Sequence, residues 1–265
     1  MAETQRREVW AAGEQYEPYV GRWSREVARV FLPALAVPPD RDWLDVGCGT
    51  GALVQTILDQ AEPRSVVGAD ASAGFVEYAR AHIPSPRVSF EVADARTLTL
   101  ASESVDAAVS GLMLNFVPQP EQAASEMARV VRAGGLVAAY VWDYAEGMEL
   151  MRLFWEAAVT LDPDAPDEGR RFSICQPGPL ADLFTGAGLG GVEAWAIDIP
   201  THFRNFDDYW TPFLGGQGAA PAYTMTLSEE QRATLRERLR AELPTRDDGS
   251  IHLTARAWAV TGYKS

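Results

Sequence analysis

The sequence predicts an α/β protein built on a doubly wound, mostly parallel sheet with helical insertions. Between residues 42 and 142, short apolar runs alternate with helical patterns, which is the order that βαβ units produce. The runs are almost continuously hydrophobic, as expected for strands that are buried on both faces. The 265 residues are enough for one domain with a core that needs no disulfide or metal.

Five of the apolar runs predict parallel strands joined by four crossovers. The predicted strands cover residues 43–46, 65–69, 88–92, 105–110 and 136–141. Apolar residues recur at helical spacing between them, at Leu53 and Ile57, at Val76 and Ala79, and at Ala123, Met127 and Val130. Ser72 predicts an N-cap for the second helix, and the pair Gly134 and Gly135 predicts the end of the third.

After Tyr144 the pattern changes to insertions and two further strands. A helical stretch at 149–159, an acidic loop at 161–168 and a short helix at 180–184 predict an insertion. Strands at 192–199 and 253–263 are expected to pair antiparallel, which gives about seven strands in total. Between them, Ser228 and Gln231 have the spacing of a capping box, and Pro244 ends the helix that they begin.

The composition limits the possible partners. With 37 acidic and 23 basic side chains, the formal charge is −14, which argues against a sequence-independent grip on nucleic acid or anionic lipid. Cys48 and Cys175 lie outside any metal-ligand or disulfide spacing. We find no apolar signal region and no run of about 18 apolar residues. We therefore expect a cytoplasmic monomer or homodimer with a small-molecule partner, no metal and no membrane.

A glycine-rich turn carries the chemistry. Asp45-Val46-Gly47-Cys48-Gly49-Thr50-Gly51 follows the first strand and begins a helix, so it lies at the carboxyl edge of the sheet, where ligands bind in open α/β folds. Glycines at alternating positions allow positive φ angles and the close approach of a ligand to the backbone. The alternative is a tight turn into a helix with no ligand.

Asp70 gives this turn its context. It ends the second strand, 19 positions after Gly51, at a spacing where an acid accepts hydrogen bonds from the ribose hydroxyls of an adenosine. The turn lacks the G-x-G-x-x-G form of a dinucleotide site, and no lysine follows to make a P-loop. The pattern therefore favours an adenosine cofactor over a nicotinamide dinucleotide.

These residues resemble the class I S-adenosylmethionine-dependent methyltransferases across most of residues 40–145. The resemblance is to the small-molecule branch that includes the ubiquinone and menaquinone biosynthesis C-methyltransferases. It extends to Phe116-Val117-Pro118 and to residues 129–135, with Ala133 where the family usually has proline. It implies a Rossmann-like sheet, S-adenosyl-L-methionine as cofactor and S-adenosyl-L-homocysteine as product.

The resemblance also implies roles for individual residues. The implied cofactor-binding residues are Asp45, Gly47, Cys48, Gly49, Gly51, Asp70, Ala71, Asp94, Ala95, Ser110, Gly111 and Leu112. Asp45 would position the cofactor's amino group, and Asp70 would bind the ribose. Asp94 with Ala95 would read the adenine, and residues 110–112 would pass beneath the sulfonium.

The N-terminal segment is expected to cover the cofactor as a lid. It crowds Tyr16, Tyr19, Arg22 and Trp23 into eight residues, and such a segment folds over the cofactor in the family that the chain resembles. We expect Tyr19 and Arg22 to contact the cofactor, with Arg22 on its carboxylate through a charge-assisted hydrogen bond. Tyr16 and Trp23 would face the acceptor. The alternative is aromatic packing with a surface arginine.

The acceptor site is predicted from aromatic and polar residues near the sheet edge. The candidates are Asn115, Trp142, Phe206 and Trp210. Together they have the apolar composition of a small-molecule pocket, although aromatics also hold insertions to a domain. His202 is the candidate general base, and its alternative is a surface histidine. By its place, Asp106 is expected to be structural.

The expected reaction is methyl transfer to an oxygen, nitrogen or carbon atom of a small organic acceptor. A sulfonium donor carries its own leaving group, so the enzyme mainly has to align the reactants in line. The alternative is a catalytically silent protein that binds the same cofactor as a sensor or partner. The charge and the lack of a base-flipping motif disfavour a nucleic-acid acceptor, whereas a protein acceptor stays open. The chain divides into residues 1–40 with the lid, the core at 41–145, the helical insertion at 146–190 and the C-terminal strands at 191–265.

Overall fold

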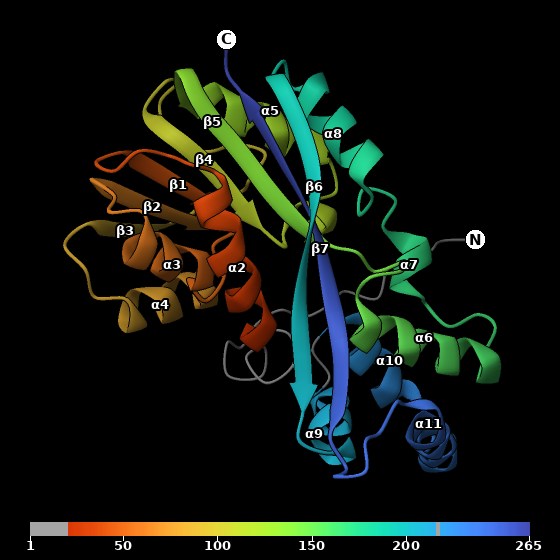
Figure 1. The fold of residues 1–265 in the computed structure, drawn as a ribbon. Helices are drawn as coiled ribbons and strands as arrows, with labels where there is room; N and C mark the ends of the chain where they lie inside the picture. Colours follow the sequence, from red (N-terminus) through yellow and green to blue (C-terminus); the bar gives the residue numbers. More distant parts are fainter. Residues whose placement is uncertain (1–20, 216–217) are drawn as a thin grey trace.

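A seven-stranded sheet forms the centre of the molecule (Figure 1). The computed structural model describes residues 21–215 and 218–265. The strands are β1 (Asp42–Val46), β2 (Ser65–Asp70), β3 (Val88–Val92), β4 (Val105–Gly111), β5 (Val131–Trp142), β6 (Gly190–Phe203) and β7 (Ile251–Tyr263). Their order across the sheet is β3-β2-β1-β4-β5-β7-β6. The predicted Rossmann-like architecture is confirmed.

Strands β1 to β5 are parallel, and the chain reverses its direction across the sheet between β3 and β4. The helices of the crossovers are α3 (Ala52–Gln60), α4 (Ala73–His82) and α5 (Pro120–Val130), whereas residues 93–104 join β3 to β4 without a helix. Because such crossovers are right-handed, α3 and α4 lie on one face and α5 on the other. The reversal creates a switch point between β1 and β4, where a ligand site is expected.

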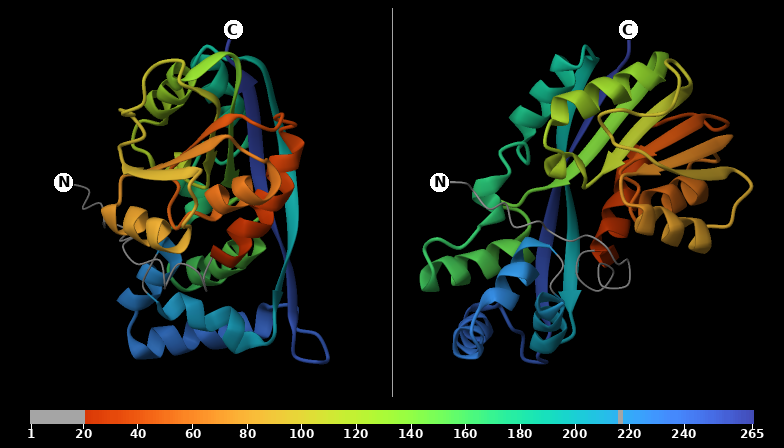
Figure 2. Two further views of the ribbon diagram at one scale, coloured as in Figure 1. Left: turned by 90° about the vertical axis from the view of Figure 1, so that its left-hand side faces the viewer. Right: turned by 180° about the vertical axis from the view of Figure 1, so that it is seen from behind.

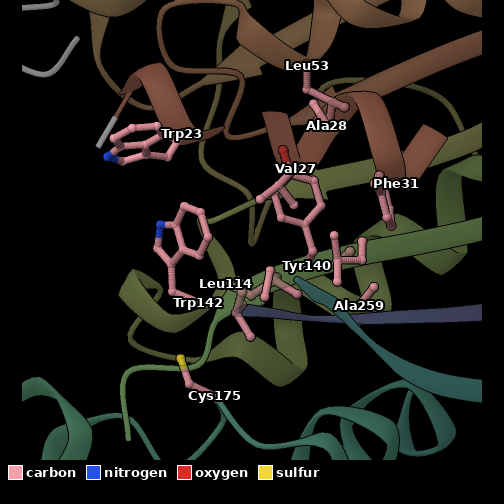
Figure 3. Packing of buried hydrophobic residues seen from close by; sticks show 14 of the residues in the cluster. Trp23, Val27, Ala28, Phe31, Leu53, Leu114, Tyr140, Trp142, Cys175 and Ala259 are labelled. Carbon is pink, nitrogen blue, oxygen red and sulfur yellow. The ribbon is translucent and has the colours of Figure 1, made fainter. Parts of the chain in front are cut away.

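Helix α2 (Arg22–Ala34) covers the centre of one face beside α3. Its residues Val27 and Phe31 are fully buried, and the Phe31 ring meets Tyr140 of β5 edge-on, with 4.8 Å between the ring centroids (Figure 3). On the opposite face, α5 packs beside α8 (Pro177–Gly186). The core is thus apolar on both sides of the sheet, which explains the nearly continuous hydrophobic runs.

The antiparallel pair β6 and β7 extends well beyond the parallel strands and supports a second group of helices (Figures 1 and 2). Around it lie α6 (Glu149–Leu161), α7 (Glu168–Arg171), α9 (Phe206–Trp210), η3 (Thr211–Leu214), α10 (Ala219–Thr226) and α11 (Glu229–Glu242). Aromatic side chains of α6, α9, η3 and α10 pack against one another. The Phe154 and Phe213 rings stack at 4.5 Å, and the Tyr209 hydroxyl donates to Leu150 O at 3.0 Å.

Local sequence signals were confirmed at two helix starts and were wrong at one helix end. Ser72 accepts a hydrogen bond from Phe75 N, and Ser228 with Gln231 forms the capping box. The pair Gly134 and Gly135 does not end α5, which stops at Val130. Both glycines lie in β5, where Gly134 has a φ of 75° and donates to Lys264 O. The positive φ of Gly134 therefore belongs to an irregularity in strand β5 and not to a helix cap.

An ion-pair cluster joins the strands at the amino edge of the sheet. Asp106 accepts a hydrogen bond from Asp42 N at 2.8 Å and pairs with Arg132 at 2.9 Å, while Arg64 pairs with Asp42. This edge is opposite the glycine-rich turn. The structural role expected for Asp106 is confirmed.

Candidate functional site

A pocket of about 400 Å³ lies at the carboxyl edge of the parallel strands. The sequence-predicted residues that line it are Asp45, Gly47, Cys48, Gly49, Asp70, Ala71, Asp94, Ala95, Gly111, Leu112 and Trp142. They come from the ends of β1 to β5 and the turns that follow. The pocket is at the switch point between β1 and β4, as the topology requires.

The glycine-rich turn is held by β2 and leaves one position open. Gly47 N and Cys48 N both donate to Ala69 O, at 2.7 and 3.0 Å. Gly47 has a φ of 75°, and a Cβ built on it would lie 2.3 Å from Met113 Cγ. Gly49 has a φ of 52°, and a Cβ there would meet no atom within 4 Å. The turn therefore packs tightly at Gly47 and presents bare backbone to the pocket at Gly49.

Asp70 ties this turn to the start of α4. Its carboxylate accepts hydrogen bonds from Gly49 N at 2.9 Å and from Ser72 N at 2.8 Å. Burial raises the pKa of Asp70, and the two amides act against that rise. A carboxylate has about four acceptor positions, so two remain for a ligand that reaches the pocket.

Asp45 is a buried carboxylate without a partner. Its side chain is on the pocket wall and the residue is 1% exposed, yet neither carboxylate oxygen accepts a hydrogen bond within residues 21–215 and 218–265. Burial, with the charge of Asp70 as a second cause, raises the pKa of Asp45 to about 8, and the nearby backbone N–H of Val54 acts against that rise. A buried unpaired carboxyl is costly unless a cation or a donor meets it. The geometry thus fits a ligand that brings an ammonium group to Asp45.

Replacing Asp45 with asparagine should make the ligand-free protein less sensitive to rising pH. The folded-state pKa of about 8 is above the ordinary value of 3.8, so the folded protein holds a proton that the unfolded chain releases. Stability is therefore lost as the pH rises from about 4 through 8, by up to about 1.4 kcal/mol per pH unit. Urea unfolding at several pH values checks this. A stability difference between Asp45→Asn and wild type that does not change with pH would contradict it.

The other half of the pocket is aromatic. Tyr140, Trp142, Tyr144 and Phe116 line it beside the ends of β4 and β5. Phe172, which follows α7, supports this wall, with its ring centroid 5.3 Å from that of Phe116 and 5.4 Å from that of Tyr144. The charged lining residues lie near the ends of β1 and β2 or follow β3. The pocket thus has a polar half and an aromatic half.

Sequence reasoning missed several lining residues. They are Ser24, Thr50, Ala52, Leu53, Ser72, Phe75, Ala93, Arg96, Met113 and Tyr140, none of which was assigned to the site. Tyr140 carries a signal that could have found it, because it precedes Trp142 by two positions and so shares its face of β5. Arg96 had no such signal, because it lies in the irregular loop after β3, where no strand or helix periodicity indicates which way a side chain faces.

Two predicted cofactor residues support the pocket from behind. Ser110 is fully buried and donates from Oγ to Val46 O at 2.8 Å, which joins β4 to β1. Gly51 begins α3 with a φ of 89°, and a Cβ there would lie 2.3 Å from Ile83 Cδ1. The structure does not place either among the lining residues. Both shape the edge on which the lining residues lie.

His202 is not brought into the pocket. It lies on β6, where side chains alternate between the two faces, and its neighbours Thr201 and Phe203 are the buried ones. The exposed His202 ring stacks on His252 of β7, with 4.1 Å between the centroids. The interpretation of His202 as the general base is therefore not supported by this geometry.

Phe206 and Trp210 lie in α9, at the far end of the β6–β7 pair. Both are buried, and their rings stack with 6.4 Å between the centroids. Neither lines the pocket, so their role here is helix packing. Asn115 is 9% exposed in η2 (Leu114–Phe116), and its Nδ2 finds no hydrogen-bond partner in the described parts of the chain.

The start of α2 lies against the end of β6. Arg22 pairs with Asp208 at 3.4 Å, and its guanidinium lies 4.4 Å from the Trp23 ring centroid and 4.8 Å from that of Phe203. Neither Arg22 nor Trp23 lines the pocket, although the next residue, Ser24, does. Tyr16 and Tyr19 lie outside the described residues.

Two kinds of feature are absent from residues 21–215 and 218–265. Within them, no group of three or more His, Cys, Asp or Glu side chains is arranged to hold a metal ion. Among the helices of these same residues, none combines the length and the apolar character needed to cross a membrane.

Comparisons with known proteins give the same family as the site. Residues 44–139 match the model of the methyltransferase domain family. The chain is 31% identical over 141 residues to malonyl-[acyl-carrier protein] O-methyltransferase of Methylococcus capsulatus, covering 52% of this chain and 51% of that protein. It is 25% identical over 227 residues to trans-aconitate 2-methyltransferase of Variovorax paradoxus, covering 84% and 86%. The YcgJ protein of Bacillus subtilis has a similar fold, with a TM-score of 0.60 and 17% identity over 90% of this chain and 98% of that one.

Several of these matches cover only part of this chain and part of the relative. The chain spans 33%, 44% and 51% of the length of three curated relatives that it matches. The matched segment 44–139 contains the glycine-rich turn, Asp70 and Asp94. It covers most of the parallel part of the sheet, in which the strand order is β3-β2-β1-β4-β5. Residues 44–139 therefore form a methyltransferase domain.

Proposed function

We propose that this protein transfers a methyl group from S-adenosyl-L-methionine to a small organic acceptor by in-line displacement. The observation that carries the proposal is the unpaired, buried carboxylate of Asp45 beside the open backbone at Gly49. A ligand that lies on this turn and brings a cation to Asp45 would satisfy both features. The cofactor, when bound, supplies an activated methyl group together with its own leaving group.

The residues of the polar half fit the parts of this cofactor. Asp45 would hold the ammonium group, and the free acceptor positions of Asp70 would receive the ribose hydroxyls. Asp94 and Ala95 line the same side and would meet the adenine. Bare backbone at Gly49 permits the close approach that these contacts require. The assignment of Arg22 to the cofactor carboxylate would need Arg22 to leave Asp208.

The aromatic half is the proposed acceptor side. Trp142 ends β5 and Tyr144 follows it, beside Gly111 and Leu112 at the end of β4, where the reacting methyl would lie. Leu112 has a φ of 60° and donates from its backbone to Tyr140 O at 2.8 Å, which fixes the loop below. These residues exclude water and orient an acceptor, and alignment is the main demand of the reaction. Their aromatic surface supports an apolar acceptor.

Product formation tests the proposal. Purified protein is incubated with S-adenosylmethionine and a panel of phenols, hydroquinones, amines and carboxylic acids, and S-adenosylhomocysteine is measured. We expect binding of both sulfur compounds, and methyl transfer to at least one apolar acceptor. Absence of binding to either compound would overturn the cofactor assignment. Binding without turnover on a broad panel would instead favour a cofactor-binding protein that does not catalyse.

A further inference from the structure

Arg96 and Asp94 form a compact unit on the pocket wall. After β3 the chain makes a turn in which Asp94 Oδ1 accepts a hydrogen bond from Arg96 N at 2.9 Å and Asp94 O accepts one from Thr97 N at 2.9 Å. The Arg96 side chain then folds back onto the same carboxylate. Its Nε lies 3.0 Å from Oδ1 and its Nη2 lies 2.6 Å from Oδ2. Asp94 is thus held by its own turn and by a two-point guanidinium contact.

This arrangement leaves the carboxylate with capacity for one more donor. An ionised carboxylate offers about four acceptor positions. Three donor atoms of Arg96 occupy it: the backbone nitrogen, Nε and Nη2. The hydrogen bonds from Arg96 lower the pKa of Asp94, so the group stays an anion that only accepts. Its remaining position suits an N–H donor and repels a carbonyl oxygen.

Arg96 also connects Asp94 to the opposite wall of the pocket. Its Nη1 donates to Gln119 Oε1 at 3.3 Å. Gln119 is the N-cap of α5 and directly follows Val117 and Pro118, which line the pocket. The guanidinium therefore bridges the turn after β3 and the start of α5, and its planar fork fixes the carboxylate against both.

We propose that Arg96 is a positioning residue that sets Asp94 to accept a hydrogen bond from the exocyclic amine of adenine. Arg96 acts through Asp94, and its contribution is selectivity for an amino purine over an oxo purine. The inference rests on the proposed function, because it requires an adenosine cofactor in this pocket. Loss of the Arg96 side chain would leave the carboxylate held by the backbone amide of residue 96 alone and would leave Gln119 without its guanidinium partner.

The test compares two ligands that differ at position 6 of the purine and, as a consequence, in whether the neighbouring N1 carries a hydrogen; the Asp94→Ala variant gives the part of the preference that does not depend on the carboxylate. The affinities of S-adenosylhomocysteine and of its inosine analogue, which has a carbonyl in place of the amine, are measured by titration calorimetry. For wild type we expect a preference of about tenfold or more for the adenine compound, because a hydrogen bond to a charged group contributes about that much to affinity. In Arg96→Ala the preference should fall to about threefold or less, and in Arg96→Lys it should be only partly restored, since lysine lacks the fork.

Two further variants provide the references. Asp94→Ala gives the preference of a site without the reading carboxylate. Arg80→Ala removes another arginine that bonds to β3, through Nη2 to Phe90 O at 2.8 Å, but does not line the pocket, so its preference should match wild type. Thermal unfolding of each variant confirms that the proteins are folded.

The outcomes separate this inference from the proposed function. If wild type binds neither ligand, the proposed function fails. If wild type binds with the expected preference and Arg96→Ala keeps that preference, Arg96 does not position Asp94 and the inference is overturned. Tighter binding of the adenine compound by Arg96→Ala also overturns it, because Arg96 would then compete with adenine for Asp94.

Discussion

The Asp70→Ala variant should bind S-adenosylmethionine and S-adenosylhomocysteine at least about 100-fold more weakly than wild type. The carboxylate would accept two hydrogen bonds from the ribose, and bonds to a charged group contribute about 1.5–3 kcal/mol each. It also anchors Gly49 N and Ser72 N, so its loss loosens the glycine-rich turn and the start of α4 together. Titration calorimetry of both compounds gives the affinities.

Asp70→Asn is the matched variant for this experiment. Its side chain keeps the size of aspartate and one acceptor oxygen, so it can hold one of the two backbone amides. We expect it to unfold modestly below the wild-type temperature, because one backbone amide loses its acceptor, while binding much more weakly than wild type. NADH is the ligand control and should bind to none of the proteins. Wild-type affinity in Asp70→Ala would show that the ribose lies elsewhere, and NADH binding would favour a dinucleotide site.

The sheet could be predicted from the sequence because buried parallel strands have a simple pattern. The central strands β1, β4 and the second half of β5 are covered on both faces, so most of their residues are apolar, and helices separate most of the runs. The turn after β1 could be predicted for a related reason. The positive φ angles at Gly47, Gly49 and Gly51 favour glycine, and the spacing of these glycines can be seen directly in the sequence.

The acceptor-side residues could not be predicted in the same way. The predicted strand ends at residue 199, before His202, but β6 continues to Phe203, and one residue of register decides which face a strand side chain takes. Phe206 and Trp210 are buried in the packing of the second group of helices, where their rings stack. An aromatic residue in a sequence indicates burial without indicating which of two cavities or cores it enters.

Arg96 could not be assigned to the site from the sequence, for a different reason. Its contact with Asp94 is local, two residues apart, and an Asp-x-Arg sequence is compatible with many solvent-exposed turns. What gives it a place in the site is the loop between β3 and β4, which has no helix and lets the turn reach the pocket wall. Irregular loops lack the periodicity from which a position can be inferred.

The Gly49→Ala variant should separate folding from cofactor binding. Gly49 and Gly134 both have a positive φ, of 52° and 75°, and a Cβ at either would meet no atom within 4 Å. Alanine at each position therefore brings the backbone cost of about 1–2 kcal/mol without a clash. Gly134 is far from the pocket lining, so Gly134→Ala is a matched control for this cost.

We expect both variants to lose similar stability and only one to lose the cofactor. In Gly49→Ala the new methyl group occupies the space in which the ligand would lie against the backbone, so affinity should fall about 100-fold, comparable to the loss of a few kcal/mol. Gly134→Ala should bind like wild type. The measurements are urea unfolding without ligand and calorimetry with S-adenosylhomocysteine. Equal affinities in the two variants would mean that the ligand does not approach the turn at Gly49, and Asp45 would then need another partner for its buried carboxyl group.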